Sequence, residues 1–190
     1  MHLLFVCTGN ICRSPTAERL TQAYAAHLPD PGQLTASSAG TRAVYGSRME
    51  PNAELVLDSL GGSGRGFLAR QISPEIVADA DIVLAMTEQH RTTVLHNSPR
   101  HLARTFTLLE AITLADAVAP QALSDPADLR VRGRDLALAM VRQRAMRHAA
   151  EPLSDDILDP IGGDPILFAQ VGEQIAGALT GWLDILTGRR

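Results

Sequence analysis

The stretch LLFVCTGNICRSPTAERL, residues 3–20, places a strand, a tight turn and a helix in succession. Residues 3–6 are a short apolar run of the kind that forms a buried strand. Apolar side chains then return on one face of a helix, at Leu20, Tyr24 and Leu28. The turn CTGNICRS, residues 7–14, contains both cysteines of the chain and an arginine. We therefore expect a strand–turn–helix unit whose turn holds the reactive side chains.

Strands and helices continue to alternate after this unit. Three further segments have the apolar or alternating pattern of strands: residues 33–41, 80–86 and 104–109. Two segments between them have helical patterns: residues 51–60, entered at Pro51 and left at Gly61 and Gly62, and residues 87–96. Buried strands that alternate with helices indicate an open parallel sheet covered on both faces.

The last stretch of the chain has the clearest helical pattern. Its apolar residues recur at steps of three and four: Leu167, Val171, Ile175, Leu179, Trp182 and Leu186. Asp164 is a suitable N-cap and Pro165 suits the first turn. Together with the earlier segments, this pattern predicts a single α/β domain over residues 1–190, with an open, twisted, parallel four-stranded sheet. Ligands of such sheets bind at the carboxyl ends of the strands, which is where residue 7 lies.

Residues 113–150 depart from this alternation. TLADAVAPQALSDPADL, residues 113–129, has the Pro and Asp punctuation of a loop. RDLALAMVRQRAMRHAA, residues 134–150, has the pattern of a separate Arg-rich helix. We expect this helix to be a solvated amphipathic surface element, with a lid or a partner surface as the alternative.

Composition and charge exclude several classes of protein. The formal charge of −4 gives no general electrostatic reason for nucleic-acid binding. No apolar run approaches the length of a membrane span, and the four-residue run near the N-terminus is too short for the core of a signal peptide. Two cysteines five residues apart would close too small a loop to staple a secreted domain. We therefore expect a cytoplasmic protein with reduced thiols.

The cysteine-containing turn has the parts of an oxyanion site. Backbone N–H groups around Gly9, aided by the positive end of a helix dipole, make a concave site for a tetrahedral anion. Ser14 and Pro15 suit the cap and first residue of that helix. The same field favours the thiolate form of Cys7, which is the nucleophilic form. Arg13 can hold two oxygens of a bound phosphate, and this stabilisation counts most in the transition state.

VCTGNICRSPTAE, residues 6–18, resembles the active-site loop of the low-molecular-weight protein tyrosine phosphatases of bacterial type. Four other motifs recur in the order of that family: SSAGT at 37–41, ARQIS at 69–73, DIVLAM at 81–86 and DP at 159–160. The resemblance spans the chain apart from roughly residues 113–150. We therefore expect this segment to be an insertion that is atypical of the family.

The resemblance implies a role for each position of the loop. Cys7 is implied to be the nucleophile that takes the phosphoryl group, and Arg13 to bind phosphate and the transition state. Seven residues are implied to bind phosphate: Thr8, Gly9, Asn10, Ile11, Cys12, Arg13 and Ser14. Asn10 and Ser14 are implied to hold the loop, with the Ser14 hydroxyl donating to the thiolate. Ser38 matches a serine of the supporting network.

The second cysteine matches a family position as well. Cys12 corresponds to the second loop cysteine, which can form a reversible disulfide with the nucleophile Cys7 under oxidation. The resemblance thus implies that one thiol reacts and that its neighbour can protect it. A purely structural role for Cys12 is the alternative.

The general acid is expected to be an aspartate. A loop carboxylate must protonate the leaving oxygen and later deprotonate the water that hydrolyses the phosphocysteine. Four aspartates precede a proline: Asp30, Asp125, Asp159 and Asp164. Asp164 is already explained as a helix cap, and Asp30 opens a turn. Asp159 precedes a Gly-Gly loop before the final helix, where the family keeps its acid. The resemblance therefore favours Asp159, with Asp125 and Asp164 as alternatives.

The substrate pocket departs from the family pattern. Many relatives follow the proline after the acid with aromatic residues that wall a slot for a phosphotyrosine ring, but this chain has Ile161 and Gly162. Tyr45 and Ile11 could supply walls instead, although Tyr45 could equally be an ordinary loop tyrosine. The family's phosphoarginine phosphatases have Thr where this chain has Ile11, so the apolar Ile11 favours an aryl ester.

We therefore expect a phosphatase that acts on a phosphorylated protein, foremost on tyrosine phosphate, or on a small aryl phosphate. It would release inorganic phosphate through phospho-Cys7, with no metal or other cofactor. Protein arginine phosphatase and arsenate reductase coupled to a small thiol are the enzymatic alternatives on the same fold. A phosphate-binding or redox-sensing module is the non-enzymatic one, and the candidate acid Asp159 argues against it because a binder needs no proton donor.

Overall fold

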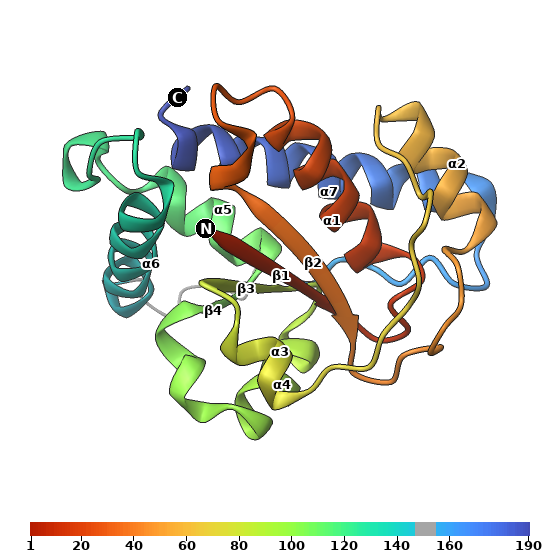
Figure 1. Ribbon diagram of the computed structural model, residues 1–190. Helices are drawn as coiled ribbons and strands as arrows, with labels where there is room; N and C mark the ends of the chain where they lie inside the picture. The colour runs from red at the N-terminus through yellow and green to blue at the C-terminus, as the bar shows by residue number, and fades with distance from the viewer. Residues whose placement is uncertain (147–154) are drawn as a thin grey trace.

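A computed structural model describes residues 1–146 and 155–190. Its centre is a parallel sheet with the strand order β2-β1-β3-β4 (Figure 1). The four strands are β1 (His2–Cys7), β2 (Thr35–Gly40), β3 (Ile82–Ala85) and β4 (Thr105–Thr107). Every strand pair is parallel. The predicted open parallel four-stranded sheet is confirmed. From β1 the chain adds β2 on one side and then β3 and β4 on the other, so the strand order reverses at β1.

Helices cover both faces of this sheet, as predicted. Leu3 and Phe5 of β1 face a core that includes residues of α1 (Arg13–Ala25), α5 (Leu108–Asp116) and α7 (Pro165–Thr187). Leu4 and Val6 point to the other face, where α3 (Pro74–Ala78) and α4 (Glu88–Asn97) pack. The remaining helices are α2 (Pro51–Ser59), α6 (Leu129–Met146) and the short 3-10 helices η1 (Pro31–Gln33), η2 (Pro99–Arg104) and η3 (Pro120–Ala122).

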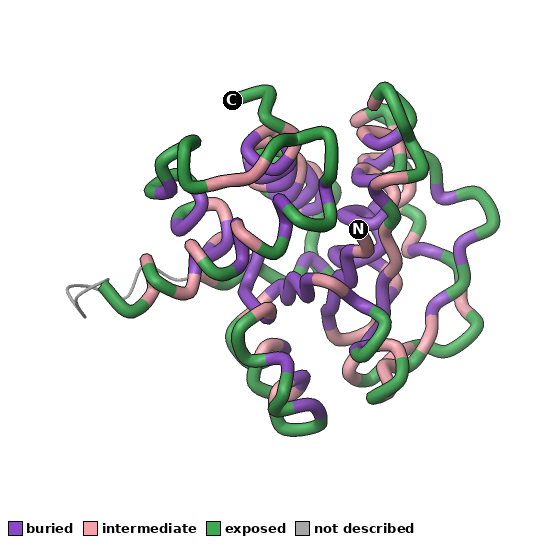
Figure 2. Tube along the Cα trace, turned by 60° about the vertical axis from the view of Figure 1, so that its left-hand side comes forward, coloured by how far each residue is buried: buried purple, intermediate pink, exposed green. Residues whose placement is uncertain are grey.

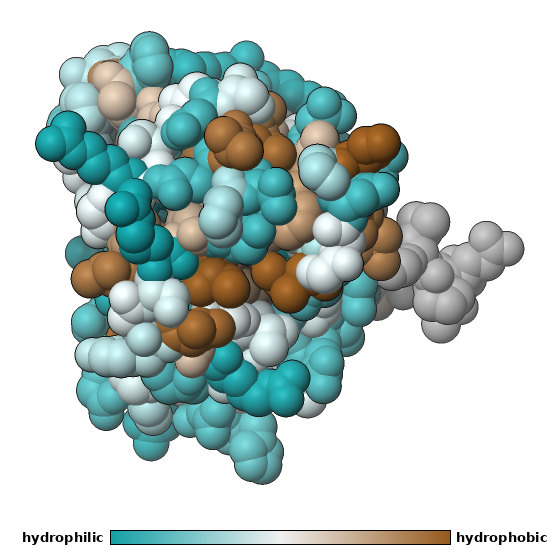
Figure 3. Space-filling view, turned by 90° about the vertical axis from the view of Figure 1, so that its right-hand side faces the viewer, coloured by the Kyte–Doolittle hydropathy of each residue, from teal (hydrophilic) through white to brown (hydrophobic). Residues whose placement is uncertain are grey.

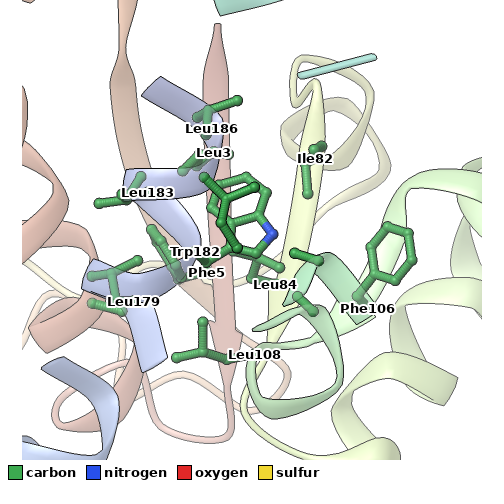
Figure 4. Close-up of a cluster of buried hydrophobic side chains, with 14 of the residues drawn as sticks. Leu3, Phe5, Ile82, Leu84, Phe106, Leu108, Leu179, Trp182, Leu183 and Leu186 are labelled. Atoms are coloured by element: carbon green, nitrogen blue, oxygen red, sulfur yellow. The ribbon is translucent and has the colours of Figure 1, made fainter. Parts of the chain in front are cut away.

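The larger core lies between the sheet and α7. Trp182 of α7 is fully buried and packs in one cluster with Phe5 of β1 and Leu84 of β3 (Figure 4). The buried segments gather at the centre of the molecule and the exposed ones lie around it (Figure 2). Five of the six residues in the predicted stripe are buried: Val171, Ile175, Leu179, Trp182 and Leu186. Asp164 caps α7 by accepting a hydrogen bond from the Leu167 N–H at 2.9 Å, which confirms the predicted start.

The segment around residue 108 differs from the prediction. Strand β4 ends at Thr107, and the leucines at 108 and 109, predicted as strand, begin helix α5. Thr107 and Glu110 form a capping box, in which each side chain accepts a hydrogen bond from the other residue's backbone N–H. The loop predicted from residue 113 is therefore helical as far as Asp116.

Helix α6 is an amphipathic surface helix, as predicted: one face packs on the main core, and Arg130, Arg134 and Arg142 are exposed. It begins at Leu129, five residues before the predicted start, and Leu136 and Met140 are fully buried in the main core. Arg144 forms two hydrogen bonds to the Glu110 carboxylate, at 2.6 and 2.8 Å, which join α6 to α5. Residues 147–150 of the predicted helix lie outside the described residues.

Arg132 fixes α6 to the end of α7. Its guanidinium is buried and donates to the carbonyl oxygens of Leu186 at 2.7 Å and Ile185 at 3.0 Å. A third hydrogen bond goes to the Ser124 carbonyl. These acceptors include the last carbonyls of α7, where the helix dipole favours a cation. The Arg-rich character of α6 therefore has a structural use at this position.

We expect Arg132→Met to lower the free energy of unfolding by about 2–4 kcal/mol, because buried carbonyl oxygens lose their donors. Urea denaturation measures the loss. Arg134→Met is the matched control, since Arg134 is exposed on the same helix and should change stability by less than about 0.5 kcal/mol. Equal, small effects of the two substitutions would contradict the structural role of Arg132.

No helix within the described ranges combines the length and apolar character needed to cross a bilayer.

Candidate active site

The site lies in the turn between β1 and α1, at the carboxyl end of the central strand. Cys7 is the last residue of β1 and Arg13 is the first residue of α1. The prediction that Ser14 caps this helix is wrong, because Cys12 occupies the N-cap position and makes no capping hydrogen bond with its side chain. Ser14 lies inside the first turn, and its hydroxyl is directed to the sulfur of Cys7 instead, 2.9 Å away.

Asn10 holds the turn in its shape. Its φ of 54° lies in the left-handed region, which asparagine tolerates better than most residues. Its backbone N–H donates to Cys7 Sγ at 3.3 Å, and its side-chain Nδ2 donates to Ser14 Oγ at 3.0 Å and to Ser38 Oγ at 2.7 Å. Its Oδ1 accepts from the Arg70 N–H at 2.8 Å. Every polar group of this buried side chain is thus bound to a different part of the fold.

The supporting network continues beyond the predicted residues. Ser38 donates to Glu18 Oε2 at 2.6 Å, and Glu18 is only 8% exposed. Burial raises the pKa of Glu18, while the hydrogen bond from Ser38 opposes this shift. Arg70 adds a second contact, from Nε to the Ser38 carbonyl oxygen at 2.7 Å. We did not predict roles for Glu18 and Arg70, although both lie in family motifs, at the end of VCTGNICRSPTAE and in ARQIS.

Arg13 and Asp159 form an ion pair at the open side of the turn. Arg13 is 4% exposed, and it donates to Asp159 Oδ2 at 2.6 Å and to the Ile157 carbonyl oxygen at 3.0 Å. The Asp159 side chain is 47% exposed. The segment of residues 157–159 is held to the sheet because the Ile157 N–H donates to the carbonyl oxygen of Met86, just after β3, at 2.8 Å. A residue 146 positions away in sequence is thereby brought to Arg13.

The other three Asp-Pro pairs lie away from this ion pair. Asp164 caps α7, and Asp30 caps η1 by accepting from the Gly32 N–H at 3.1 Å. Asp125 accepts from the Ala127 N–H at 2.8 Å and lines, together with Asp30, a separate cavity of about 540 Å³. Of the four candidates, Asp159 is the one that lines the cavity at Cys7.

The cavity at Cys7 has a volume of about 320 Å³. It is lined by Cys7, Thr8, Gly9, Ile11, Cys12, Arg13, Arg42, Val44, Asp159 and Ile161. Apolar side chains gather on the face of the molecule that carries α2 (Figure 3). Tyr45, which we expected to form a wall of the pocket, is 81% exposed and does not line the cavity. Its neighbour Val44 lines the cavity instead. Ile11 and Ile161 lie at the cavity, as predicted.

The model of the family described as low molecular weight phosphotyrosine protein phosphatase matches residues 2–145. This match runs from β1 into α6 and covers most of the chain. The chain belongs to the low-molecular-weight phosphotyrosine protein phosphatase family. The resemblance seen in the cysteine-containing turn is thereby confirmed. Within this family, that turn is the phosphatase loop, and we use this name below for residues 7–14.

Individual relatives support the same assignment. The low molecular weight protein-tyrosine-phosphatase Wzb of Escherichia coli (strain K12) is 43% identical over 89 residues, which cover 47% of this chain and 56% of Wzb. The protein-arginine-phosphatase of Bacillus subtilis (strain 168) is 30% identical over 145 residues, 76% of this chain and 95% of that relative. A solved YwlE arginine phosphatase mutant with a phosphorylated active-site serine aligns with a TM-score of 0.71 at 26% identity, covering 100% of this chain and 98% of that chain. The chain spans 56–63% of the length of curated relatives such as Wzb.

The two cysteines of the phosphatase loop have different surroundings. Both are free thiols. Cys7 contacts the polar groups of Ser14 and Asn10, whereas Cys12 packs in an apolar cluster with Met49 and Phe168. Burial raises the pKa of Cys12, and the neighbouring Cys7 raises it further. Cys12 is therefore a protonated, weakly reactive thiol at neutral pH.

His90 is a buried contact of the phosphatase loop that sequence patterns did not reveal. Its Nε2 lies 2.8 Å from Thr8 Oγ1, and its Nδ1 lies 2.8 Å from Thr87 Oγ1. Burial lowers the pKa of His90 to about 4, and the charge of Arg13 contributes to the shift. The imidazole is therefore neutral at pH 7 and links the start of α4 to the residue that follows Cys7.

Because His90 binds a proton more weakly in the folded protein than in the unfolded chain, the free energy of unfolding should fall as the pH drops from 6.5 to about 4. One such group contributes a slope of at most about 1.4 kcal/mol per pH unit. We expect His90→Asn to flatten this dependence in urea titrations at several pH values. His96→Asn, at an exposed position on the same helix, should leave it as in the wild type. Identical slopes for all three proteins would refute the expectation.

Proposed function

We propose that the protein is a cysteine-dependent phosphomonoester hydrolase that acts on tyrosine phosphate in proteins and on small aryl phosphates. The observation that carries the proposal is the meeting of Cys7, Arg13 and Asp159 at one cavity. A nucleophile, a guanidinium for the equatorial oxygens and a carboxyl for the leaving group are the three parts that this reaction needs.

In the proposed first step, Cys7 Sγ attacks phosphorus and the ester P–O bond breaks. The hydrogen bonds from Ser14 and the Asn10 N–H stabilise the sulfur as an anion before the attack. Arg13 turns from the Asp159 carboxylate to the phosphoryl oxygens, whose charge it stabilises in the transition state. Asp159 takes a proton from solvent once Arg13 has left its carboxylate, and it gives that proton to the leaving oxygen.

In the second step, water attacks the phosphocysteine and the S–P bond breaks. The Asp159 carboxylate, left by the first step, takes a proton from that water, so the acid is restored and inorganic phosphate leaves. The Ser14 hydroxyl and the Asn10 N–H again donate hydrogen bonds that stabilise the released sulfur as an anion. Every proton donor and acceptor in this cycle is a group of the chain or water.

The cavity walls favour an aryl ester over phosphoarginine. Ile11, Val44 and Ile161 present apolar surface to the group attached to phosphate, which suits an aromatic ring. A phosphoarginine side chain carries N–H donors that need acceptors, and the one acidic side chain among the lining residues, Asp159, serves as the proton donor in the proposed mechanism. The arginine phosphatases among the relatives keep protein arginine phosphatase as the second candidate.

Arsenate reduction and phosphate binding without turnover have less support. The chain has no cysteine besides Cys7 and Cys12, so arsenate reduction would require an external thiol as the electron donor. A pure phosphate binder or redox sensor would not explain why a carboxyl group lines the cavity beside the sulfur. The two free thiols agree with a cytoplasmic location. Redox pairing of the two cysteines, and the insertion of residues 113–150 into the family domain, stay predictions.

A panel of phosphopeptides tests the proposed specificity. We expect the purified protein to release phosphate fastest from a phosphotyrosine peptide, more slowly from the matched phosphoarginine peptide and least from the phosphoserine peptide. Assays of arsenite formation with added thiol should give no turnover. Faster release from phosphoarginine would replace the proposed specificity by the second candidate, and no release from any ester would remove the proposed function.

A further inference from the structure

The loop after β2 is fixed to the phosphatase loop by backbone hydrogen bonds. The N–H of Thr41 donates to the carbonyl oxygen of Cys7, that of Arg42 to Thr8 and that of Val44 to Gly9, each at 2.9 Å. Residues 41–44 therefore run alongside residues 7–9, beginning at the nucleophile Cys7. Any side chain of this second loop that points inward has a defined position relative to bound phosphate.

Two more features keep this register. Gly40 lies so close to the phosphatase loop that a Cβ atom there would be 2.5 Å from the Thr8 carbonyl oxygen. The Ala43 N–H donates to Gln71 Oε1 at 2.9 Å, in a segment separate from the phosphatase loop. The loop of residues 41–44 is thus bound to two separate segments, and the backbone of Arg42 cannot shift without breaking one of these contacts.

Arg42 brings a second guanidinium to the cavity. It is exposed and lines the cavity together with Arg13. The carboxylate among the lining residues, Asp159, is the ion-pair partner of Arg13, and within residues 1–146 and 155–190 no ion pair involves Arg42. His90, which is hydrogen-bonded to the Thr8 hydroxyl, is neutral at pH 7 because its pKa is about 4. Arg42 is therefore a cation at the rim of the cavity with no ion-pair partner among the described residues.

We propose that Arg42 determines specificity by binding a second anionic group, the carboxylate of a Glu or Asp next to the phosphotyrosine of a protein substrate. The inference rests on the proposed function and names the substrate class within it. The phosphate occupies the phosphatase loop, the aromatic ring lies against Val44 and Ile161, and the neighbouring acidic side chain reaches the guanidinium at the rim.

The net charge of the whole protein does not favour acidic peptides, so the preference must come from a direct contact with Arg42. The formal net charge is −4, so the protein as a whole repels an acidic peptide at long range. Arg42 must therefore act through a direct contact, and an exposed contact between two charges has a modest strength. We expect a preference of about 2- to 5-fold, larger if the guanidinium binds the carboxylate through two hydrogen bonds. The preference should shrink as salt is added, because exposed charges are screened.

The test compares two phosphotyrosine peptides that differ only in their flanking residues, Glu in one and Gln in the other. The measured quantity is the ratio of kcat/KM for the Glu peptide to that for the Gln peptide. We expect a ratio of about 2–5 for the wild type, a ratio near one for Arg42→Gln and a ratio below one for Arg42→Glu. Arg48→Gln is the matched control, since Arg48 lies in the same loop region but does not line the cavity, and its side chain is 74% exposed.

A wild-type ratio near one would overturn the inference, and so would a preference that Arg42→Gln and Arg42→Glu keep. Loss of the preference in Arg48→Gln would overturn it too, because the effect would then be a general one of charge. If the wild type hydrolyses p-nitrophenyl phosphate but neither peptide, the inference about protein substrates fails while the phosphatase chemistry stands. If it hydrolyses none of the three, the proposed function fails and takes the inference with it.

Discussion

Replacing Cys7 by serine is expected to lower kcat for p-nitrophenyl phosphate by on the order of 10⁴-fold or more, because a hydroxyl is a far weaker nucleophile at neutral pH than a thiolate. The fold should stay intact. Cys7 is 2% exposed, and serine is nearly its size and can form the same hydrogen bonds to Ser14 and the Asn10 N–H. Steady-state kinetics measures the loss, and urea denaturation checks the fold.

Cys12→Ser is the matched control, since it changes the other thiol of the same loop. Cys12 packs in an apolar cluster, so its replacement is expected to cost some stability but to leave kcat within about tenfold of the wild type. If Cys7→Ser keeps its activity, the nucleophile lies elsewhere. If both variants lose activity equally, the loss reflects damage to the loop and not the removal of a nucleophile.

Asp159→Asn is expected to lower kcat/KM for phenyl phosphate by about 10²–10⁴-fold, because phenolate is a poor leaving group without a proton. The loss on p-nitrophenyl phosphate should be much smaller, since nitrophenolate leaves without help. The parameter kcat/KM reports the steps up to ester cleavage and so separates the acid role from the later base role. In the wild type, Arg13 donates to the Asp159 carboxylate at 2.6 Å. The asparagine oxygen can accept the same hydrogen bond, so the geometry of the pair is retained.

Asp125→Asn supplies the control for this substitution. Asp125 also precedes a proline, but its carboxylate accepts the N–H of Ala127 and lines a different cavity. The variant should therefore hydrolyse both esters like the wild type. An equal loss on phenyl and p-nitrophenyl phosphate in Asp159→Asn would show that Asp159 positions Arg13 and that another group is the acid.

The parts of the fold that follow from local patterns could be predicted from the sequence. The apolar run at residues 3–6 and the apolar stripe of α7 each show a simple hydrophobic pattern with a clear end. The polar turn at residues 7–14 marks where the first strand stops. The start of α5 was also present in the sequence, as the capping-box pair Thr107 and Glu110, but the apolar residues 108–109 extended the pattern of the preceding strand. A short apolar run does not distinguish strand from helix.

The parts that depend on contacts between distant segments could not be predicted. The burial of Arg132 depends on the carbonyl groups at the end of α7, more than fifty residues away, and nothing local separates it from exposed Arg134. His90 shares a helix with exposed His96, and only the approach of Thr8 gives it a role. The position of Asp159 was inferred from the family resemblance, because an Asp-Pro pair by itself indicates a turn.

The central claim is that the reaction proceeds through a phosphoryl group on Cys7. The most direct measurement mixes Asp159→Asn with p-nitrophenyl phosphate, quenches the reaction within the first turnover and locates the phosphoryl group by mass spectrometry of the digested protein. Hydrolysis of the intermediate should be slow in this variant, since the base is gone. We predict close to one phosphoryl group per molecule, on the peptide that contains Cys7. Rapid release of nitrophenol with no phosphorylated peptide, or with the phosphoryl group on another residue, would contradict the account.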